Sequence, residues 1–298
     1  MAWLRSGKSQ LGYAVLTPLA NGAAALRLEG GGERPRVALA RFETETPANA
    51  EAWRRLAQAA GLERARLITL LDPAFYQTVI IEAPNVPEDE LRGAIRWKVK
   101  DMINFHTDDT VLEYLPVPGG AGRPDSLFVI AAQASAVREL AAPFQAADLP
   151  LAVIDIRETA QHHLARLLAP EDYAVSMMHF DGQNALLTFS HGDHLVFARR
   201  IEGRGASGEF LLERLAMETQ RSVDYFERQF SWLPLSKLFL APTEVGEPLA
   251  VRLRGYLPVG VELVDLDALF DLSAAPELAS IGSRTTVFHL LGAALRDG

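Results

Sequence analysis

Apolar runs of strand length, separated by turn residues, make up the first part of the chain. Three of them follow one another at Gly12–Leu16, Ala23–Glu29 and Arg36–Phe42. The first two are joined by PLANG, whose Asn21-Gly22 pair is a strong hairpin signal. A helical pattern then precedes a further buried run at Arg66–Leu71. The pattern therefore predicts three strands, a helix and a strand.

The helical pattern lies in TPANAEAWRRLAQAAG and carries signals at both ends. Thr46 fits the N-cap, Pro47 fits the first helical position, and Gly61 fits the end of the helix. One face of this helix is apolar at helical spacing and consists of Trp53, Leu56, Ala57 and Ala60. We expect that face to be buried.

The same order of elements recurs in the second part of the chain. Three strand-like runs lie at Tyr173–Phe180, Asn184–Ser190 and His194–Arg200, and a long helix at Glu209–Phe230 leads to a strand at Lys237–Ala241. The long helix keeps an inward-facing stripe, formed by Leu212, Leu215, Ala216, Thr219, Val223, Phe226 and Phe230. A repeated order of elements is stronger evidence for a fold than any single predicted element.

Each half of the chain then adds a helix, a strand and a helix. These are Ala136–Ala147, Leu151–Asp155 and Ile156–Leu168 in the first half, and Pro248–Tyr256, Val259–Val264 and Pro276–Leu295 in the second. Two such halves, each with a mixed five-stranded sheet, face each other across a cleft in actin-like and sugar-kinase-like folds. The sequence thus predicts an α/β protein with a duplicated actin-like (ribonuclease H-like) fold in two lobes.

One segment, Gln77–Ala132, interrupts the first half with the order strand, helix, strand, strand. Pro87 opens its helix, and three acids follow in the first turn, where the helix dipole favours negative charge. Trp97 falls off the predicted buried stripe, which consists of Leu91, Ala94, Ile95, Val99, Met102 and Ile103. We expect a small α+β subdomain at 77–132, inserted into a first lobe of 1–76 and 133–170. A second lobe at 171–298 would be reduced, because it lacks a further subdomain.

Composition narrows the class of protein further. The 298 residues are 49% hydrophobic, enough for a sizeable core, and the net charge of −9 argues against a nucleic-acid partner. The absence of cysteine excludes disulfides, thiolate catalysis and Cys-based zinc sites. No apolar run approaches the ~20 residues of a bilayer span, and MAWLRSGKSQ lacks the apolar core of a signal peptide. We therefore expect a cytoplasmic protein.

Two long stretches carry a resemblance to a known family. PNVPEDELRGAIRWKVKDMINFHTDDTVLEYLPV resembles the inserted subdomain of PilM-like proteins, and most of all that of the MshI proteins of mannose-sensitive haemagglutinin pilus biogenesis. LERLAMETQRSVDYFERQF resembles the second-lobe helix of the same family, and LFLAPTEVGEPLAVRLRGYL the strand and helix that follow. The resemblance covers nearly the whole chain, with both stretches in the family's order and spacing.

The resemblance implies a role in a type IV pilus machine. PilM-like proteins are cytoplasmic, actin-like components that bind the short cytoplasmic tail of a PilN-type inner-membrane protein. The tail lies in a groove between the first lobe and the inserted subdomain. The chain is thus expected to bind a PilN-like tail, to meet other pilus assembly components and to reach the inner membrane only through its partner. The predicted contact residues near the inserted helix are Arg92, Trp97, Lys98 and Phe105.

The residues that would hold a nucleotide depart from the family's pattern. Actin-like ATPases grip phosphates with one hairpin turn per lobe and hold Mg²⁺ with acids that end the first strands. Here GYAVLTPLANG has no acid and places Pro18 and Leu19 where N–H or hydroxyl donors are needed. The second-lobe strand MMHF has no acid either, and Asp181 comes later, at the turn itself, where an acid can cap the turn with its own side chain. We expect a degenerate site without catalytic residues, metal or required cofactor; if ATP and Mg²⁺ were bound, the contacts would be Asp181, Gly182 and Asn184.

Two other patterns have plain structural explanations. Gly203, Gly205 and Gly208 match a dinucleotide fingerprint, but the preceding strand ends in two arginines, so a link before a helix is favoured. His162 and His163 are adjacent on a helix and point to different sides, which favours packed histidines over a metal site.

Two alternative functions stay open. One is a working ATPase or nucleotide-dependent switch in pilus assembly or type II secretion. The other is a GspL-like cytoplasmic domain of type II secretion, which the lack of a following transmembrane segment disfavours.

Overall fold

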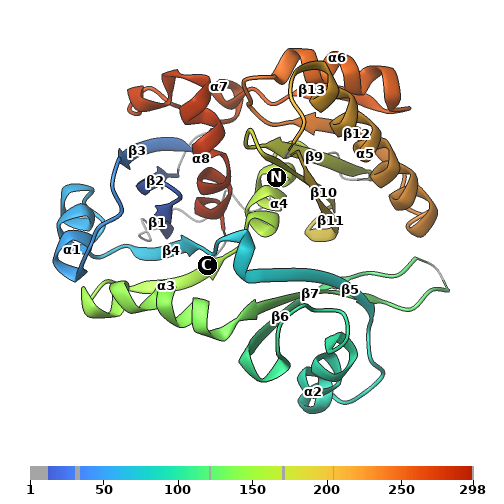
Figure 1. Cartoon of the computed structure of the whole chain (residues 1–298), viewed down its shortest axis with the longest axis horizontal. Coiled ribbons are helices and arrows are strands. Elements are labelled where there is room, and N and C mark those ends of the chain that lie inside the picture. The colour runs from blue at the N-terminus through green and yellow to red at the C-terminus, as the bar shows by residue number, and fades with distance from the viewer. Residues whose placement is uncertain (1–12, 31–33, 121, 170–171, 204, 297–298) are drawn as a thin grey trace.

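The first lobe is built on a mixed five-stranded sheet. The computed structural model describes residues 13–30, 34–120, 122–169, 172–203 and 205–296 (Figure 1). The predicted first residue of the first strand, Gly12, and the segment MAWLRSGKSQ lie outside these residues. The strand order is β3-β2-β1-β4-β8, with β1, β2 and β3 antiparallel and β1, β4 and β8 parallel. The strands are β1 (Tyr13–Leu19), β2 (Gly22–Glu29), β3 (Arg36–Glu43), β4 (Arg66–Leu70) and β8 (Leu151–Asp155).

The second lobe repeats this sheet strand for strand. Its order is β11-β10-β9-β12-β13, again with the first three strands in sequence antiparallel and the others parallel to β9. The strands are β9 (Ala174–Phe180), β10 (Asn184–His191), β11 (His194–Glu202), β12 (Leu235–Leu240) and β13 (Gly260–Leu263). The identical strand order confirms the predicted duplication.

The hairpin between β1 and β2 depends on glycine. Leu19 pairs with Gly22 across the two-residue turn, and Gly22 has a φ of +121°. A methyl group at Gly22 would lie 2.9 Å from the carbonyl carbon of Glu43 on β3. The Asn21-Gly22 signal therefore marks the turn that the sequence predicted.

Helix α1 (Ala50–Ala59) packs its predicted apolar face on the first sheet, together with α3 (Ala134–Ala146). Its predicted start was wrong, because Asn49 is the N-cap and accepts a hydrogen bond from the N–H of Ala52 at 3.0 Å. The Thr46 hydroxyl instead donates to the carbonyl oxygen of Gly22 at 3.0 Å, so that Thr46 braces the hairpin turn.

The outer face of the second sheet is covered by α5 (Gly208–Gln229) and α6 (Gly246–Tyr256) (Figure 1). Every residue of the predicted inward-facing stripe of α5 is buried, which confirms the periodicity argument. The remaining short elements are α7 (Leu266–Leu269) and the 3-10 turns η1 (Pro73–Phe75), η2 (Thr107–Asp109) and η3 (Pro276–Ala279).

Two helices cross between the lobes (Figure 1). Helix α4 (Arg157–Arg166) follows the last strand of the first sheet, yet its Gln161 hydrogen-bonds to the second sheet. Helix α8 (Ile281–Ala294) follows the second sheet, yet it shares an apolar cluster with Val15 and Ile68 of the first. Each lobe therefore supplies a helix to the core of the other, and the two cores are continuous.

The inserted subdomain is an antiparallel sheet of order β5-β7-β6 with one helix. Its elements are β5 (Tyr76–Glu82), α2 (Glu88–Val99), β6 (Thr110–Val117) and β7 (Ser126–Gln133). Ile95, Val99 and Ile103 are buried, and Trp97 is 80% exposed, as predicted. The prediction that Met102 is buried was wrong: α2 ends at Val99, so Met102 leaves the helical stripe and is 47% exposed.

Candidate functional site: the interlobe cleft and the face of the inserted helix

A cleft of about 750 Å³ lies between the two lobes. Both hairpin turns that the sequence singled out contribute to its wall, together with the exit of β4 and parts of α3, α4 and α8. The polar residues of the wall are Thr17, Asn21, Asp72, Glu139, Arg157, His179, Asp181, Gln183, Thr285, Thr286 and His289. This is the place where an actin-like fold would hold a nucleotide, so the groups that face it decide what it can do.

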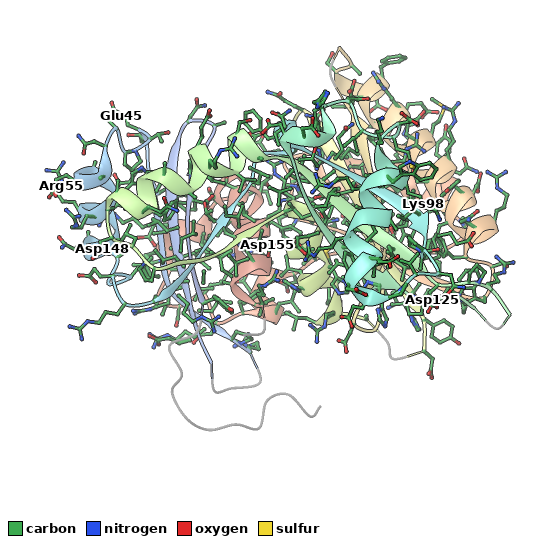
Figure 2. All side chains as sticks on the ribbon, turned by 90° about the horizontal axis from the view of Figure 1, so that it is seen from below. Glu45, Arg55, Lys98, Asp125, Asp148 and Asp155 are labelled. Carbon is green, nitrogen blue, oxygen red and sulfur yellow. The ribbon has the colours of Figure 1, made fainter. Side chains whose placement is uncertain are left out.

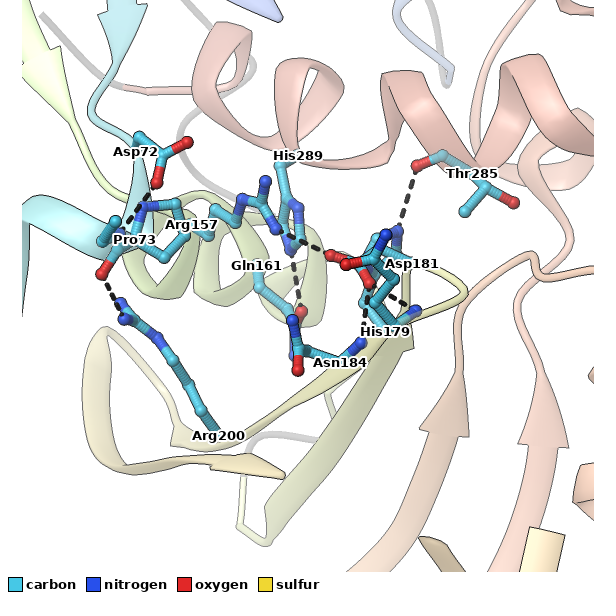
Figure 3. A network of polar contacts seen from close by, with 12 residues as sticks. Asp72, Pro73, Arg157, Gln161, His179, Asp181, Asn184, Arg200, Thr285 and His289 are labelled. Atoms are coloured by element: carbon cyan, nitrogen blue, oxygen red, sulfur yellow. Dashed lines mark hydrogen bonds and ion pairs between the residues drawn. The ribbon is translucent and has the colours of Figure 1, made fainter. Parts of the chain in front are cut away.

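In the second lobe, the carboxylate of Asp181 is occupied by protein groups. Its Oδ1 accepts hydrogen bonds from the N–H groups of Gln183 at 3.0 Å and Asn184 at 2.8 Å, while Gly182 takes a φ of +92°. Its Oδ2 lies 3.2 Å from the Arg157 guanidinium, across the cleft (Figure 3). Burial would raise the pKa of Asp181, but the two N–H groups and Arg157 outweigh it and hold the pKa below its ordinary value.

The sequence interpretation of Asp181 as a turn cap is thus confirmed. The two N–H groups that a phosphate would need in this turn already donate to the side chain of Asp181. An anionic ligand would have to displace that carboxylate.

In the first lobe, the residues of β1 that lead into the β1–β2 turn offer few donors. Pro18 has no N–H group. The hydroxyl of Thr17 is buried and is engaged by β4, because the N–H of Leu70 donates to it at 3.1 Å and the hydroxyl of Thr69 lies 3.2 Å from it. At the end of β1, the Thr17 hydroxyl is therefore engaged within the protein and Pro18 supplies no N–H donor to the cleft.

A row of polar residues extends from the cleft wall into the protein (Figure 3). Nε2 of His179 lies 3.0 Å from the carbonyl oxygen of Thr285, and Nε2 of His289 lies 3.0 Å from Oε1 of Gln161. Gln161 in turn donates to the carbonyl oxygen of Met177 at 2.7 Å. Because carbonyl oxygens only accept, both rings carry their proton on Nε2. Burial lowers the pKa of His179 to about 4 and that of His289 well below its ordinary value.

The lowered pKa values of the buried histidines His179 and His162 lead us to expect that mild acid destabilises the protein. The pKa of His179 falls from 6.5 to about 4 on folding, and burial lowers that of His162 to about 3. In mild acid the unfolded chain therefore binds protons that the folded chain does not. The free energy of unfolding consequently decreases as the pH is lowered. Between about pH 7 and pH 5 we expect a loss of about 2 kcal/mol per histidine. Urea unfolding at both pH values measures it.

The control is His179→Gln, which keeps a donor for the Thr285 carbonyl but cannot titrate. Its stability should depend less steeply on pH than that of the wild type. Equal slopes for the two proteins would contradict the assignment.

A second polar network ties three segments together at the edge of the cleft. Glu158 of α4 is fully buried and accepts from the hydroxyl of Tyr76 at 2.6 Å. The guanidinium of Arg200 on β11 donates to the same carboxylate at 2.7 Å, and to the carbonyl oxygen of Pro73 at 2.8 Å. Burial raises the pKa of Tyr76 well above its ordinary value, and the negative charge of Glu158 raises it further. Burial works against the charge of Arg200, but Glu158 outweighs it and raises the arginine's pKa.

The adjacent histidines of α4 have separate partners, as predicted. Nδ1 of His162 lies 2.9 Å from the Ser190 hydroxyl, whereas Nδ1 of His163 lies 3.1 Å from the carbonyl oxygen of Gly292. Within the described part of the chain, no group of three or more His, Asp and Glu side chains could hold a metal ion.

The predicted partner residues have different surroundings. Arg92 donates to the carbonyl oxygen of Leu112 at 2.8 Å and pairs with Glu113 at 3.0 Å, and Lys98 donates to the carbonyl oxygen of Glu82 at 2.8 Å. Figure 2 shows the labelled Lys98 on α2, at the face seen from below. Phe105 packs partly buried on the subdomain's own core. Arg92, Lys98 and Phe105 thus help to hold α2 and its flanks on the small sheet.

Trp97 differs from those three residues. Its side chain is 80% exposed, the largest exposed fraction among the large apolar side chains of the described residues. Arg92 and Lys98 are exposed as well, but of the four predicted positions Trp97 offers the exposed apolar side chain.

The sequence did not single out Arg157, Glu158 or Arg200 as functional. Two signals were present: an acid directly after Arg157 in the first turn of a helix, and an arginine pair ending a strand. Neither signal shows that Arg157 pairs with Asp181 or that Glu158 pairs with Arg200, because the two members of each pair come from different elements of the fold.

The duplicated sheets, the crossed helices and the cleft define the class as the actin-like ATPase fold. A solved protein of that fold and of unknown function, from Bacteroides thetaiotaomicron, matches 91% of this chain and 97% of its own, at 8% identity and a TM-score of 0.51.

Within this class, the chain has the fold of PilM. It matches the solved PilM-PilN type IV pilus biogenesis complex with a TM-score of 0.73 and 21% identity, over 97% of this chain and 99% of the other. The cytoplasmic domain of EpsL, an inner membrane component of the type II secretion system of Vibrio cholerae, matches with a TM-score of 0.52 and 14% identity, over 93% and 94% of the two chains. No family model and no curated protein matches.

Across the described ranges, none of the helices combines the length and apolar character that crossing a bilayer demands.

Proposed function

We propose that this protein is a non-catalytic adaptor of a type IV pilus machine, which binds the cytoplasmic tail of a PilN-like inner-membrane protein. The observation that carries the proposal is the similarity to the PilM-PilN complex over 97% of the chain. The protein would work at the inner face of the cytoplasmic membrane, held there by its partner. Other pilus assembly components would bind elsewhere on it, and the pilus would be of the mannose-sensitive type served by MshI.

The cleft supports the non-catalytic part of the proposal. A Mg²⁺-nucleotide needs carboxylate oxygens that are free to bind the metal, and N–H groups that are free to bind phosphate. Asp181 uses both of its oxygens within the protein, and its turn N–H groups donate to that carboxylate. The nucleotide site would therefore be degenerate at the second-lobe turn, where Asp181, Gly182 and Asn184 would shape the cleft wall instead.

The division of the chain follows the same proposal. Residues 77–132 would form the inserted subdomain that receives the tail together with the first lobe, at 1–76 and 133–170. Residues 171–298 would form a reduced second lobe. A membrane-protein tail can add as an extended strand or lie in an apolar groove, and Trp97 would cover it from α2.

The test is a titration of the purified protein with fluorescent ATP and Mg²⁺, and separately with a labelled peptide of the cytoplasmic tail of the PilN-like protein from the same organism. We expect saturable binding of the tail. We expect no saturable binding of nucleotide below about 1 mM, the level at which the binding free energy is about −4 kcal/mol. Tight nucleotide binding without the tail would favour the ATPase instead.

Replacing Trp97 with alanine is expected to weaken tail binding about tenfold, because exposed tryptophans are frequent anchors of interfaces. The melting temperature should stay nearly constant, since the side chain is 80% exposed. The matched control is Phe210→Ala on α5, a 68% exposed aromatic in the second lobe. Equal tail affinity in the wild type and W97A would remove Trp97 from the proposed surface.

Two observations support the runner-up functions. The cleft of about 750 Å³ is within the size range of small-molecule sites, which suits a nucleotide-dependent switch. The similarity to the EpsL domain suits a component of type II secretion. The two titrations separate the nucleotide-dependent switch from the adaptor. A titration with the tail peptide of a type II secretion partner tests the role in type II secretion.

A further inference from the structure

Three parts of the molecule meet at one buried carboxylate. Tyr76 is the first residue of β5, where the chain leaves the first lobe for the inserted subdomain. Glu158 lies in the first turn of α4, and Arg200 lies on β11 of the second lobe. The site therefore joins the subdomain, the first lobe and the second lobe.

Both carboxylate oxygens of Glu158 and all three guanidinium nitrogens of Arg200 form hydrogen bonds at this junction. Both oxygens of the Glu158 carboxylate are used, Oε2 by the Tyr76 hydroxyl at 2.6 Å and Oε1 by two nitrogens of Arg200 at 2.7 and 3.0 Å. The third arm of the guanidinium reaches Pro73 at the exit of β4, and the guanidinium carbon lies 4.3 Å from the centre of the Tyr76 ring. Because Glu158 has no exposed surface, these hydrogen bonds act in a medium of low dielectric constant and are costly to break.

A second attachment joins the inserted subdomain to the second lobe. The Arg123 guanidinium, in the loop between β6 and β7, lies 4.7 Å from the ring centre of Trp232 and donates to the carbonyl oxygen of Gln229 at 3.2 Å. Val117 and Phe128 of the subdomain are also buried in the apolar core of the second lobe. A hinge motion of the lobes would have to break this attachment as well as the Glu158 contacts.

We propose that Tyr76, Glu158 and Arg200 form a lock that holds both lobes and the inserted subdomain in one arrangement, which a nucleotide does not change. Hinged proteins close around ligands through a few segments that absorb the motion. Here the connection from the first lobe to the subdomain is pinned at Tyr76, and the crossed helices α4 and α8 join the cores. The lock goes beyond the proposed adaptor role, because it holds whether or not a pilus partner binds.

The chain contains no cysteine, so spin labels can be placed without background. Three exposed positions can carry labels, one in each part of the molecule. They are Gln58 on α1 of the first lobe, Lys100 after α2 of the inserted subdomain and Glu227 on α5 of the second lobe. Each pair of positions is replaced by cysteine, labelled, and measured by double electron–electron resonance with and without Mg²⁺-ATP. We expect one narrow distance distribution for every pair, unchanged by the nucleotide.

The lock is then weakened by the double variant Tyr76→Phe with Arg200→Lys. This variant keeps the positive charge beside Glu158 but loses the Tyr76 hydroxyl and the paired nitrogen donors of the guanidinium. The distributions should broaden about twofold, as new lobe arrangements become populated. The control is Arg41→Lys, in an exposed pair with Glu43 that should leave the distributions unchanged. If the double variant does not fold, as judged by circular dichroism, Tyr76→Phe alone supplies the same readout.

Two results would overturn the lock. One is a shift of the wild-type distances on addition of Mg²⁺-ATP. The other is an unchanged narrow distribution in the folded lock variant. Neither depends on the tail titration, so the lock and the adaptor role can fail separately.

Discussion

Replacing Gly292 with alanine is expected to destabilise the protein by about 3 kcal/mol or more. A methyl group at Gly292 of α8 would lie 2.6 Å from the carbonyl carbon of Ala160 on α4, well inside van der Waals contact. The added Cβ has a position fixed by its own backbone and meets backbone atoms of Ala160, so a side-chain rotation cannot relieve the clash and the helices would have to separate. Since α4 and α8 connect the two cores, separation would expose apolar surface in both lobes. Urea unfolding measures the loss.

The same helix provides a matched control. A methyl group at Gly282, near the start of α8, would meet nothing within 4 Å. Gly282→Ala should therefore be neutral or stabilising, by up to about 1 kcal/mol, because alanine favours the helix. If both variants were equally stable, the close crossing of α4 and α8 would be disproved.

Replacing Arg200 with methionine is expected to cost about 3 to 5 kcal/mol, because it leaves the buried Glu158 charge without its cation. The side chain of Glu158 is only 1% exposed, so water cannot replace the lost hydrogen bonds. Among the described residues, the Tyr76 hydroxyl would remain as the donor to the carboxylate. Chemical unfolding at neutral pH measures the change.

The double variant Glu158→Leu with Arg200→Met removes both charges and should recover much of that stability, since an apolar pair tolerates burial. The strong coupling between the two substitutions is the expected signature. A loss for R200M of less than about 1 kcal/mol would mean that the pair behaves like an exposed salt bridge.

Much of the fold could be read from local patterns. Apolar runs of strand length and the Asn21-Gly22 pair predicted the first hairpin, because a two-residue turn has few solutions. The stripe on α5 predicted a buried helix face, and every member of it is buried. The errors lie at element ends: Thr46 and Met102 were assigned by position in a pattern, whereas Asn49 caps α1 and α2 ends before Met102.

The candidate site could be predicted only in part. That Asp181 caps its own turn followed from the sequence, because Asp and Gly in a tight turn satisfy backbone N–H groups locally. Its ion pair with Arg157 did not follow, since the two residues are 24 positions apart. Likewise the sequence did not show that Arg92 and Lys98, which are exposed on α2, also donate hydrogen bonds to the neighbouring strands.

By itself, the sequence determined the duplicated order of strands and helices, the inserted subdomain and the exposure of Trp97. These depend on short-range periodicity and turn chemistry, which each segment carries within itself. Only the tertiary structure decided that α4 and α8 exchange lobes, that Gly292 lies against Ala160, and that Glu158 meets Tyr76 and Arg200. Those features depend on contacts between residues far apart in the chain, where packing and burial, not local pattern, select the partners.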